Sequence, residues 1–225
     1  GELSPSVCVL DVGLYIAQSF GQGGLAGAVL ELAGPLTESW ERQEGEDAAG
    51  AGMLAGAAAA ITVRRPEASV DAIYEYDFSP LRPSAAFVRD GRLNVADVED
   101  IDDNYDLEAI IVGPGAGAAA IRAAAGVLRG RGVYSGCRLW VVPSSRQVLM
   151  DAAREGTLET ILAAGGLILP PGADVRTLTS SGWALTTSPR LFARTPERFI
   201  LANPCAAAAS ALSGYIVDPR PLCGD

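Results

Sequence analysis

The chain contains neither histidine nor lysine, so all 17 of its basic residues are arginine. Without histidine there is no Ser-His or Cys-His nucleophile pair and no histidine-ligated zinc or iron. Without lysine there is no Schiff base and no P-loop lysine. Acid–base chemistry performed by this chain must therefore use Asp, Glu, Tyr or Cys, with arginine binding anions.

Metal motifs and membrane signals are missing as well. The four cysteines (Cys8, Cys137, Cys205 and Cys223) show no C-x-x-C spacing, so we expect no metal site and interpret them as buried or incidental thiols. No apolar run reaches the roughly 18 residues of a membrane span, and no basic segment precedes an apolar one as in a secretory signal. The net charge of −10 opposes binding to nucleic acid or anionic membranes. We therefore expect a cytoplasmic protein with no nucleic-acid or membrane partner.

The second half of the chain alternates strand and helix patterns. Strands are predicted at 108–112, 138–142, 166–169, 181–187 and 199–201, and helices from 118 to about 130, at 147–155, at 157–164 and at 205–213. The last helix opens at Asn203-Pro204, where proline suits the first helical turn. This alternation predicts an α/β fold with a mostly parallel sheet and helices on both faces.

The first half carries weaker signals. We predict helices at 6–20 and 48–61, strands at 26–33 and 69–78, and a hairpin turn at Asp90-Gly91. A flexible linker is the alternative for the Ala- and Gly-rich segment 48–61. The acidic run 97–106 is interpreted as a solvated linker, with a Mg²⁺ or Ca²⁺ site as the alternative. This divides the chain into two α/β/α domains, 1–104 and 105–225.

The loop 113–118, Gly-Pro-Gly-Ala-Gly-Ala, follows the first strand of the second half. Ligands of open α/β sheets bind beyond the carboxyl ends of the strands, so a site is expected there. The loop has no polar or reactive side chain of its own. A phosphate-binding turn is the alternative, although the spacing misses G-x-G-x-x-G and Pro114 lacks an amide donor.

Several segments match a family pattern in order. These are the helix, glycine turn and strand of 9–34, Val-Val-Pro-Ser-Ser at 141–145, the helix and Leu-Pro-Pro-Gly loop of 158–172, and Asn-Pro-Cys-Ala-Ala-Ala-Ala to Asp-Pro-Arg at 203–220. Across nearly its whole length the chain resembles the large subunit of aconitase and isopropylmalate isomerase, from the second domain to the third. The resemblance implies the aconitase-like fold.

The cluster ligands of that family are absent at the matching loops. Members hold a [4Fe–4S] cluster with one cysteine from Gly-Ser-Cys-Thr-Asn-Ser and two from Gly-Cys-x-x-Cys. The corresponding segments here are 113–118 and Gly-Ala-Asp-Val-Arg at 172–176, and the family's Asn and Glu positions fall at Gly50 and Leu54. We therefore expect no cluster and no other cofactor, so the iron-dependent mechanism does not carry over.

The resemblance also points to substrate-binding arginines. Thr-Thr-Ser-Pro-Arg-Leu-Phe-Ala-Arg at 186–194 resembles the family's Ser-x-Asn-Arg-Asn-Phe-x-Gly-Arg, whose arginines bind the substrate carboxylate. Arg190 matches, whereas Arg194 comes one residue early. Both are candidate substrate-binding residues, with ordinary surface arginines as the alternative.

Three further residues are candidates at the same edge. Asp174 replaces a cluster cysteine and is the candidate catalytic base, which requires a dry pocket that raises its pKa. An exposed loop pair with Arg176 is the alternative. Ser144 and Ser145 follow a strand and are candidates for hydrogen bonding to substrate, with turn capping as the alternative.

These features suggest a cluster-free lyase or isomerase that acts on a small carboxylic acid, in specialised bacterial metabolism. The resemblance implies partner chains that resemble the family's first domain and its swivelling small subunit. These partners would supply the missing acid–base groups. The alternative is a non-catalytic scaffold subunit that stabilises an active partner.

Overall fold

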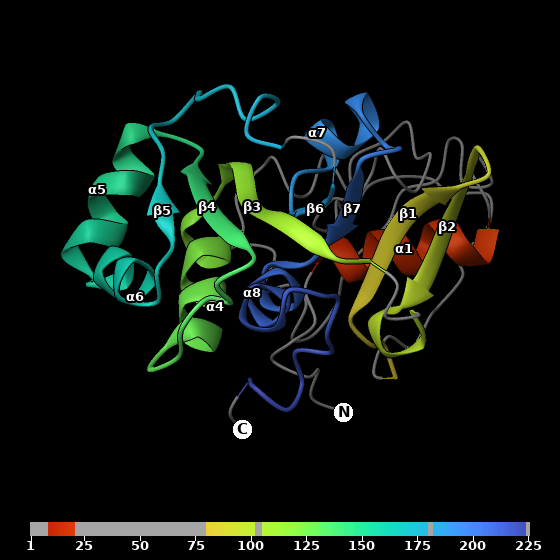
Figure 1. The fold of residues 1–225 in the computed structure, drawn as a ribbon, viewed down its shortest axis with the longest axis horizontal. Coiled ribbons are helices and arrows are strands. Elements are labelled where there is room, and N and C mark those ends of the chain that lie inside the picture. Colours follow the sequence, from red (N-terminus) through yellow and green to blue (C-terminus); the bar gives the residue numbers. More distant parts are fainter. Residues whose placement is uncertain (1–8, 21–79, 102–104, 180–181, 224–225) are drawn as a thin grey trace, which may run out of the picture.

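The computed structural model describes residues 9–20, 80–101, 105–179 and 182–223 (Figure 1). In the first of these ranges, side-chain burial is described for residues 10–15. The predicted elements at 26–33, 48–61 and 69–78 lie outside the described residues.

The described helices and strands follow the predicted alternation closely. The helices are α1 (Val9–Phe20), α4 (Ala118–Leu128), α5 (Arg146–Arg154), α6 (Thr157–Ala163), α7 (Pro189–Arg194) and α8 (Pro204–Ser213), with the short 3-10 helix η1 (Val98–Asp100). The strands are β1 (Ser84–Arg89), β2 (Arg92–Asp97), β3 (Leu107–Ala116), β4 (Arg138–Pro143), β5 (Leu167–Ile168), β6 (Trp183–Thr186) and β7 (Phe199–Ala202). Neither α7 nor η1 has a counterpart among the predicted elements.

The seven strands form one mixed sheet in the order β2-β1-β7-β6-β3-β4-β5. The five strands from β3 to β7 pair in parallel, while β1 pairs antiparallel with both β2 and β7. The mostly parallel α/β architecture is thereby confirmed. The hairpin precedes the boundary placed after residue 104 and joins the same sheet as the later strands. The two-domain division stays a prediction, because most of the first half is outside the described residues.

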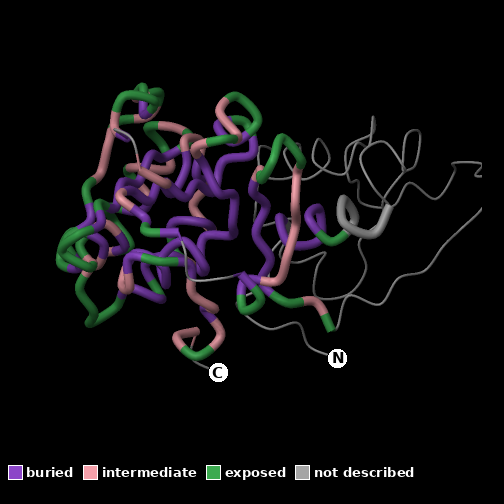
Figure 2. The backbone as a smooth tube through the Cα atoms, turned by 45° about the vertical axis from the view of Figure 1, so that its right-hand side comes forward, coloured by how far each residue is buried: buried purple, intermediate pink, exposed green. Residues whose placement is uncertain are grey.

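Helices cover both faces of the sheet (Figure 1). On one face, α4 and α8 pack against β3 and against each other, and α5 and α6 pack beside α4. On the other face, α1 lies against β1 and β2, and α7 lies against β6 and β7. Figure 2 shows the buried backbone gathered in the middle of the described part, with exposed turns around it. The strands of the sheet centre are apolar on both faces, as expected for a covered parallel sheet.

The hairpin turn is formed by Asp90 and Gly91, as predicted. Their φ angles are 53° and 70°, so both central residues have positive φ, as a type I′ turn requires. Only glycine, asparagine and aspartate adopt this conformation readily. The dipeptide therefore fixes the pairing of β1 with β2, in which Arg89 lies opposite Arg92.

The acidic segment after β2 packs onto the core, which contradicts its interpretation as a solvated linker in the described part. Val98, Ile101 and Tyr105 are buried, and the Tyr105 ring meets the Trp183 ring edge-on at 4.8 Å between centroids. The acidic residues around these three apolar positions led to the prediction of a solvated segment.

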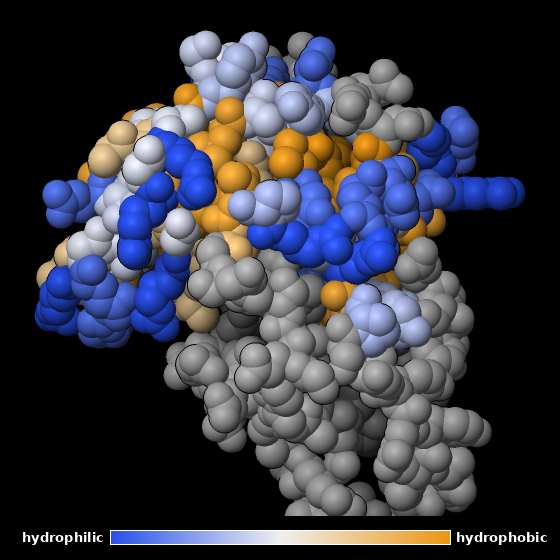
Figure 3. Space-filling view, turned by 90° about the horizontal axis from the view of Figure 1, so that it is seen from below, coloured by the Kyte–Doolittle hydropathy of each residue, from blue (hydrophilic) through white to orange (hydrophobic). Residues whose placement is uncertain are grey.

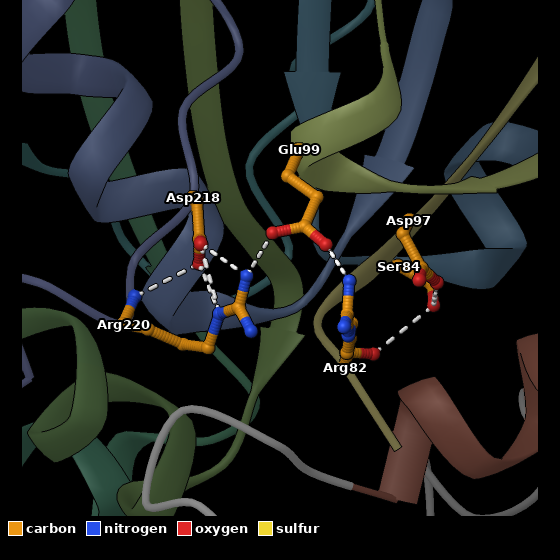
Figure 4. Close-up of polar contacts among 6 residues, drawn as sticks. All are labelled: Arg82, Ser84, Asp97, Glu99, Asp218 and Arg220. Atoms are coloured by element: carbon orange, nitrogen blue, oxygen red, sulfur yellow. Dashed lines mark hydrogen bonds and ion pairs between the residues drawn. The ribbon is translucent and has the colours of Figure 1, made fainter. Parts of the chain in front are cut away.

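An ion-pair network fastens this segment to distant parts of the chain. Figure 4 shows Glu99 of η1 between the guanidinium groups of Arg82 and Arg220. Asp218 holds Arg220 in place with a 2.8 Å hydrogen bond from Nε to Oδ2. Each surface pair is weak alone, but shared partners hold three segments in one geometry.

The surface seen from below carries both charged and apolar groups. Figure 3 shows hydrophilic residues on the described part of this face, with hydrophobic residues exposed between them. None of the helices within the described ranges is long and apolar enough to cross a membrane.

Candidate functional site

The candidate site lies at the carboxyl edge of the parallel strands. From β3 the chain continues through β4 and β5 on one side, and then returns to β6 and β7 on the other side of β3. The strand order therefore reverses between β3 and β6. Ligands of open α/β sheets bind beyond the carboxyl ends of the strands at such a switch point. The segments that meet there are the Gly113 segment, residues 113–116, and residues 186–188 at the end of β6. Residues 113–116 were predicted as part of a loop, but they form the last part of β3.

Two threonines tie these segments together. The Gly113 N–H donates to Thr187 Oγ1 at 2.8 Å, and Thr186 Oγ1 donates to the Gly113 carbonyl at 2.7 Å. Both threonines are buried. The loop's first amide is thus occupied by the protein itself, so the floor of the switch point is built from internal hydrogen bonds. Neither Thr186 nor Thr187 was predicted from the sequence to be a functional residue.

Gly113 adopts a backbone conformation that other residues rarely reach. Its φ is +108°, and a Cβ there would lie 2.5 Å from the Val142 carbonyl oxygen. The strand register between β3 and β4 shifts between Val112 and Ala116, and the Ser144 N–H then donates to the Ala116 carbonyl at 2.9 Å. Close approach of β3 and β4 therefore requires glycine at residue 113.

Helix α4 begins directly after this loop without a side-chain cap. Gly117 is the N-cap residue, and no side chain accepts from the first amides of the helix. Uncapped amides carry the positive end of the helix dipole and favour anions. This terminus adds donors to the carboxyl edge, although it does not define a ligand by itself.

Ser144 and Ser145 have different roles in the structure. The Ser145 hydroxyl accepts from the Val148 N–H at 3.2 Å and caps α5, which matches the capping alternative. Ser144 is exposed, and its hydroxyl has no hydrogen-bond partner within the described ranges. Of the two, Ser144 is therefore the candidate for contact with a substrate.

Asp174 lies in an environment different from the dry pocket that a catalytic base requires. It is exposed, and its carboxylate binds Arg176 through Nε at 2.9 Å and Nη2 at 2.7 Å. Hydrogen bonds from the side chain and backbone of Arg176 lower the pKa of Asp174 to about 2. A carboxylate with this pKa stays ionised at neutral pH and is a weak base. The geometry is that of the exposed loop pair.

Arg190 and Arg194 lie on α7, the helix that the sequence analysis did not predict. The helix begins with Ser188 as N-cap, whose hydroxyl accepts from the Leu191 N–H at 3.4 Å, and with Pro189 in its first turn. Both are ordinary start signals, so α7 was predictable from residues that we interpreted only as part of the arginine motif.

The two arginines are placed to act together. They are four residues apart on one helix, so they project from the same side of α7. Both are exposed, and neither forms a hydrogen bond or ion pair with the described part of the chain. Two unpaired guanidinium groups one helical turn apart suit a ligand with more than one carboxylate.

A shared apolar cluster holds the Asp174 loop and α7 on the same face of the sheet. Val175, between the two ion-paired residues, is buried in the cluster that contains Leu191 and Phe192 of α7. Figure 1 shows the segment between β5 and β6 on the same edge of the sheet as α7. The structure thus brings the loop of residues 172–176 and the two arginines to one edge.

A buried carboxylate beneath this edge was missed by the sequence analysis. Asp11 of α1 is 0% exposed, and it accepts from the Ser84 N–H and from Asn203 Nδ2, both at 2.9 Å. Asn203 in turn caps α8 through the Ala206 N–H at 2.8 Å. No local motif marks Asp11, because its partners are 73 and 192 residues away.

The positions of the described cysteines do not fit the iron–sulfur cluster that the family resemblance implies. Cys137 precedes β4 and so lies at the amino edge, opposite the candidate site, where burial raises its pKa to about 11. Cys205 is the second residue of α8, Cys223 packs against the same core cluster, and neither 113–118 nor 172–176 contains a thiol. Among the described residues, no group of three or more metal-binding side chains could hold an ion.

Comparison with known proteins finds large subunits of homoaconitase and of 3-isopropylmalate dehydratase. The homoaconitase large subunit of Thermus thermophilus is 46% identical over 112 residues, which is 45% of this chain. The 3-isopropylmalate dehydratase large subunit 1 of Methanopyrus kandleri is 34% identical over 170 residues, 69% of this chain. The large subunit 2 of Archaeoglobus fulgidus is 29% identical over 254 aligned positions, 98% of this chain. No family model matches.

The chain spans only part of these relatives. It covers 27% of the Thermus protein, 40% of the Methanopyrus protein and 61% of the Archaeoglobus protein. The 254 positions of the last alignment exceed the 225 residues of this chain, so the alignment contains gaps where this chain is shorter.

Proposed function

Because the chain belongs to the aconitase family, with 3-isopropylmalate dehydratase and homoaconitase large subunits as relatives, we propose that it binds a small carboxylic acid within a lyase or isomerase. The observation that carries this proposal is the pair Arg190 and Arg194. They are exposed on one side of α7 and have no partner within the described ranges, at the sheet edge where the fold places ligands.

The chemistry of the edge favours a carboxylate. Guanidinium groups bind carboxylates with two parallel hydrogen bonds, and the uncapped start of α4 and the Ser144 hydroxyl offer further donors. In the absence of histidine and lysine, Arg190 and Arg194 supply the positive charge on α7. Asp174 is ion-paired with Arg176, so we propose that it holds the Arg176 guanidinium in place and takes no part in proton transfer. The base would come from a partner chain.

Replacement of Arg190 by alanine should weaken substrate use without unfolding the protein. A hydrogen bond to a charged group contributes about 1.5–3 kcal/mol, so kcat/KM should fall roughly 10- to 100-fold. The measurement uses the complex purified from the native host through a tagged chain, with 3-isopropylmalate and related hydroxy diacids as probes. Arg194→Ala should have a smaller effect.

The control for this experiment is Arg89→Ala. Arg89 is an exposed arginine beside the hairpin turn and belongs to none of the segments of the candidate site, so its loss should leave kcat/KM unchanged. Arg190→Lys keeps the charge but not the planar fork, so it should restore only part of the activity. An active complex with the same kcat/KM after Arg190→Ala would remove this chain from substrate binding.

We further propose that the subunit works without an iron–sulfur cluster. Neither loop that matches the family's cluster loops contains cysteine, and the thiol of Cys137 lies at the opposite edge of the sheet. Substrate activation must then use protein groups and not a cluster iron.

Anaerobic treatment of the pure chain with iron and sulfide should leave it colourless. A thiolate-bound cluster needs three cysteines at one place, so no visible absorbance should remain after desalting. A family member with all three cluster cysteines, treated in parallel, is the positive control. Recovery of iron and inorganic sulfide in a fixed ratio to protein would contradict the proposal.

Partner chains are part of this proposal. The relatives are named large subunits and are longer than this chain, which supports a complex with a small subunit and with a chain for the remaining family domain. Specialised bacterial metabolism and a shared active site are extensions of the same proposal. The substances that co-purify with the chain from its host are the most direct evidence on both.

The second candidate function is a non-catalytic scaffold. The observation that favours it is that polar groups at the switch point bind each other. The N–H and carbonyl of Gly113 are both hydrogen-bonded, to Thr187 and Thr186, and so are not free for a ligand. A scaffold would raise the stability of an active partner but would not change its kinetics through Arg190. The Arg190→Ala experiment therefore separates the two functions.

A further inference from the structure

Two of the three described cysteines lie against each other beside α8. Cys205 is the second residue of the helix and is 7% exposed in the main core. Cys223 is partly buried and packs on the same core cluster, and the two side chains share a hydrogen bond. Neither is in a disulfide. The two thiols are 18 positions apart in the sequence, so this contact is made by the fold.

The segment after α8 is held so that Cys223 returns to the helix. The Val217 N–H donates to Ser210 Oγ at 3.2 Å, which lays the segment along α8. A turn then follows, in which the N–H groups of Leu222 and Cys223 both donate to the Pro219 carbonyl, at 2.9 and 3.0 Å. These hydrogen bonds therefore fix the main chain that carries Cys223.

The two thiols differ in a way that suits thiol–disulfide exchange. Cys223 is the more accessible, and its hydrogen bond with Cys205, together with the nearby Arg131 guanidinium, lowers its pKa. A thiolate is the attacking species, so Cys223 is the group that reacts first. Cys205 lies in the first turn of a ten-residue helix, where the dipole favours a thiolate.

We infer that Cys205 and Cys223 form a reversible redox pair, whose disulfide fastens the segment 215–223 to the start of α8. The same segment carries Arg220, which binds Glu99, and Asp218, which binds Arg220. Oxidation therefore locks the C-terminal segment, α8 and η1 together, and reduction leaves them joined by ion pairs, hydrogen bonds and packing.

The step balances with a low-molecular-weight disulfide such as oxidised glutathione. The Cys223 thiolate attacks one sulfur of that disulfide and releases one thiolate, which leaves a mixed disulfide on Cys223. Cys205 loses its proton and attacks Cys223 Sγ, and the second small thiolate leaves. Two protein thiols are oxidised by two electrons, one disulfide is reduced, and both leaving thiolates take up the released protons.

The test incubates the full chain with mixtures of reduced and oxidised glutathione, followed by acid quenching. The number of free thiols should fall from four to two over a single equilibrium transition, and dithiothreitol should restore four. Acid cleavage at Asp218-Pro219, the one Asp-Pro bond of the chain, should release the fragment 219–225 only after reduction. Oxidation should also raise the thermal midpoint by roughly 5–10 °C.

Variants identify the pair. Cys223→Ser and Cys205→Ala should each abolish the transition, whereas Cys137→Ser, which removes a buried thiol with a raised pKa, should leave it unchanged. Acid cleavage of the wild-type chain identifies the disulfide without any substitution, so the assignment holds even if a variant misfolds. Release of 219–225 without reduction, stable glutathione adducts in place of the internal bond, or a disulfide to Cys8 would overturn the inference.

Discussion

Replacement of Gly113 by alanine should lower the free energy of unfolding by about 3–5 kcal/mol. The added Cβ would lie 2.5 Å from the Val142 carbonyl oxygen and 3.2 Å from the Gly115 nitrogen. Both contacts are with backbone atoms of the sheet and its loop, which cannot rotate away as a side chain would. The φ of +108° adds strain for any residue with a Cβ.

The loss should extend to the candidate site. Movement of residue 113 away from Val142 weakens its two hydrogen bonds with Thr186 and Thr187, which join β3 to β6 at the switch point. Stability is measured by urea unfolding, with the slope compared between variants to confirm a two-state transition.

The matched control is Gly126→Ala in α4. A Cβ at residue 126 meets nothing within 4 Å, and the position is exposed in a helix interior. Alanine is favoured over glycine there by up to about 1 kcal/mol, so this variant should be more stable than the wild type. Equal effects of the two substitutions would contradict the assigned conformation of Gly113.

Asp11→Asn should have the second large effect, a loss of about 2–4 kcal/mol, because it places an amide donor against a donor. Asp11 Oδ1 accepts from the Ser84 N–H and Oδ2 accepts from Asn203 Nδ2. The asparagine side chain has one oxygen, so one of these buried donors loses its acceptor. The shape of the side chain hardly changes, which isolates the hydrogen-bond chemistry from packing.

A double-mutant cycle with Asn203→Ala tests the pair directly. Asn203 also caps α8 through the Ala206 N–H, so its loss alone should cost about 1–3 kcal/mol. The coupling energy between the two positions should be roughly 0.5–3 kcal/mol, since the residues share a hydrogen bond. Asp106→Asn, at an exposed carboxylate, should be neutral. Additive losses at Asp11 and Asn203 would show that the contact contributes nothing.

The large expected effects of Gly113→Ala and Asp11→Asn both come from contacts between residues far apart in the sequence, which no local pattern predicts. The Gly113 loop was expected to mark a site because it follows a strand, and that expectation depends only on local order. The closure of its floor by Thr186 and Thr187 depends on β6 lying next to β3, across more than 70 residues of chain. Strand order is set by the packing of helices on both faces, which no window of sequence contains.

The candidate site residues also show which features follow from local sequence and which depend on the fold. Ser145 was open to two interpretations from its position after a strand, and the structure uses it as the cap of α5. Asp174 and Arg176 are neighbours in sequence, but the low pKa of the carboxylate depends on its exposure and on the orientation of the guanidinium group. Arg190 and Arg194 were expected from a motif, and the helix that aligns them came from the structure.

Local elements with strong signals could be predicted from the order of residues. The Asn203-Pro204 start of α8, the Asp90-Gly91 turn and the apolar run of β3 each fold as predicted, because capping, positive φ and burial act over a few residues. The composition also determined the excluded chemistry, since a chain without histidine or lysine cannot gain either by folding.

Which of these elements meet depends on the assembled fold. It paired Asp11 with Asn203, brought Cys223 back to Cys205, and placed Glu99 between Arg82 and Arg220. The physical reason is that each contact is worth little until the sheet and its covering helices bury enough apolar surface to hold distant segments together. Those contacts therefore depend on the assembled core and cannot be predicted from a short stretch of sequence.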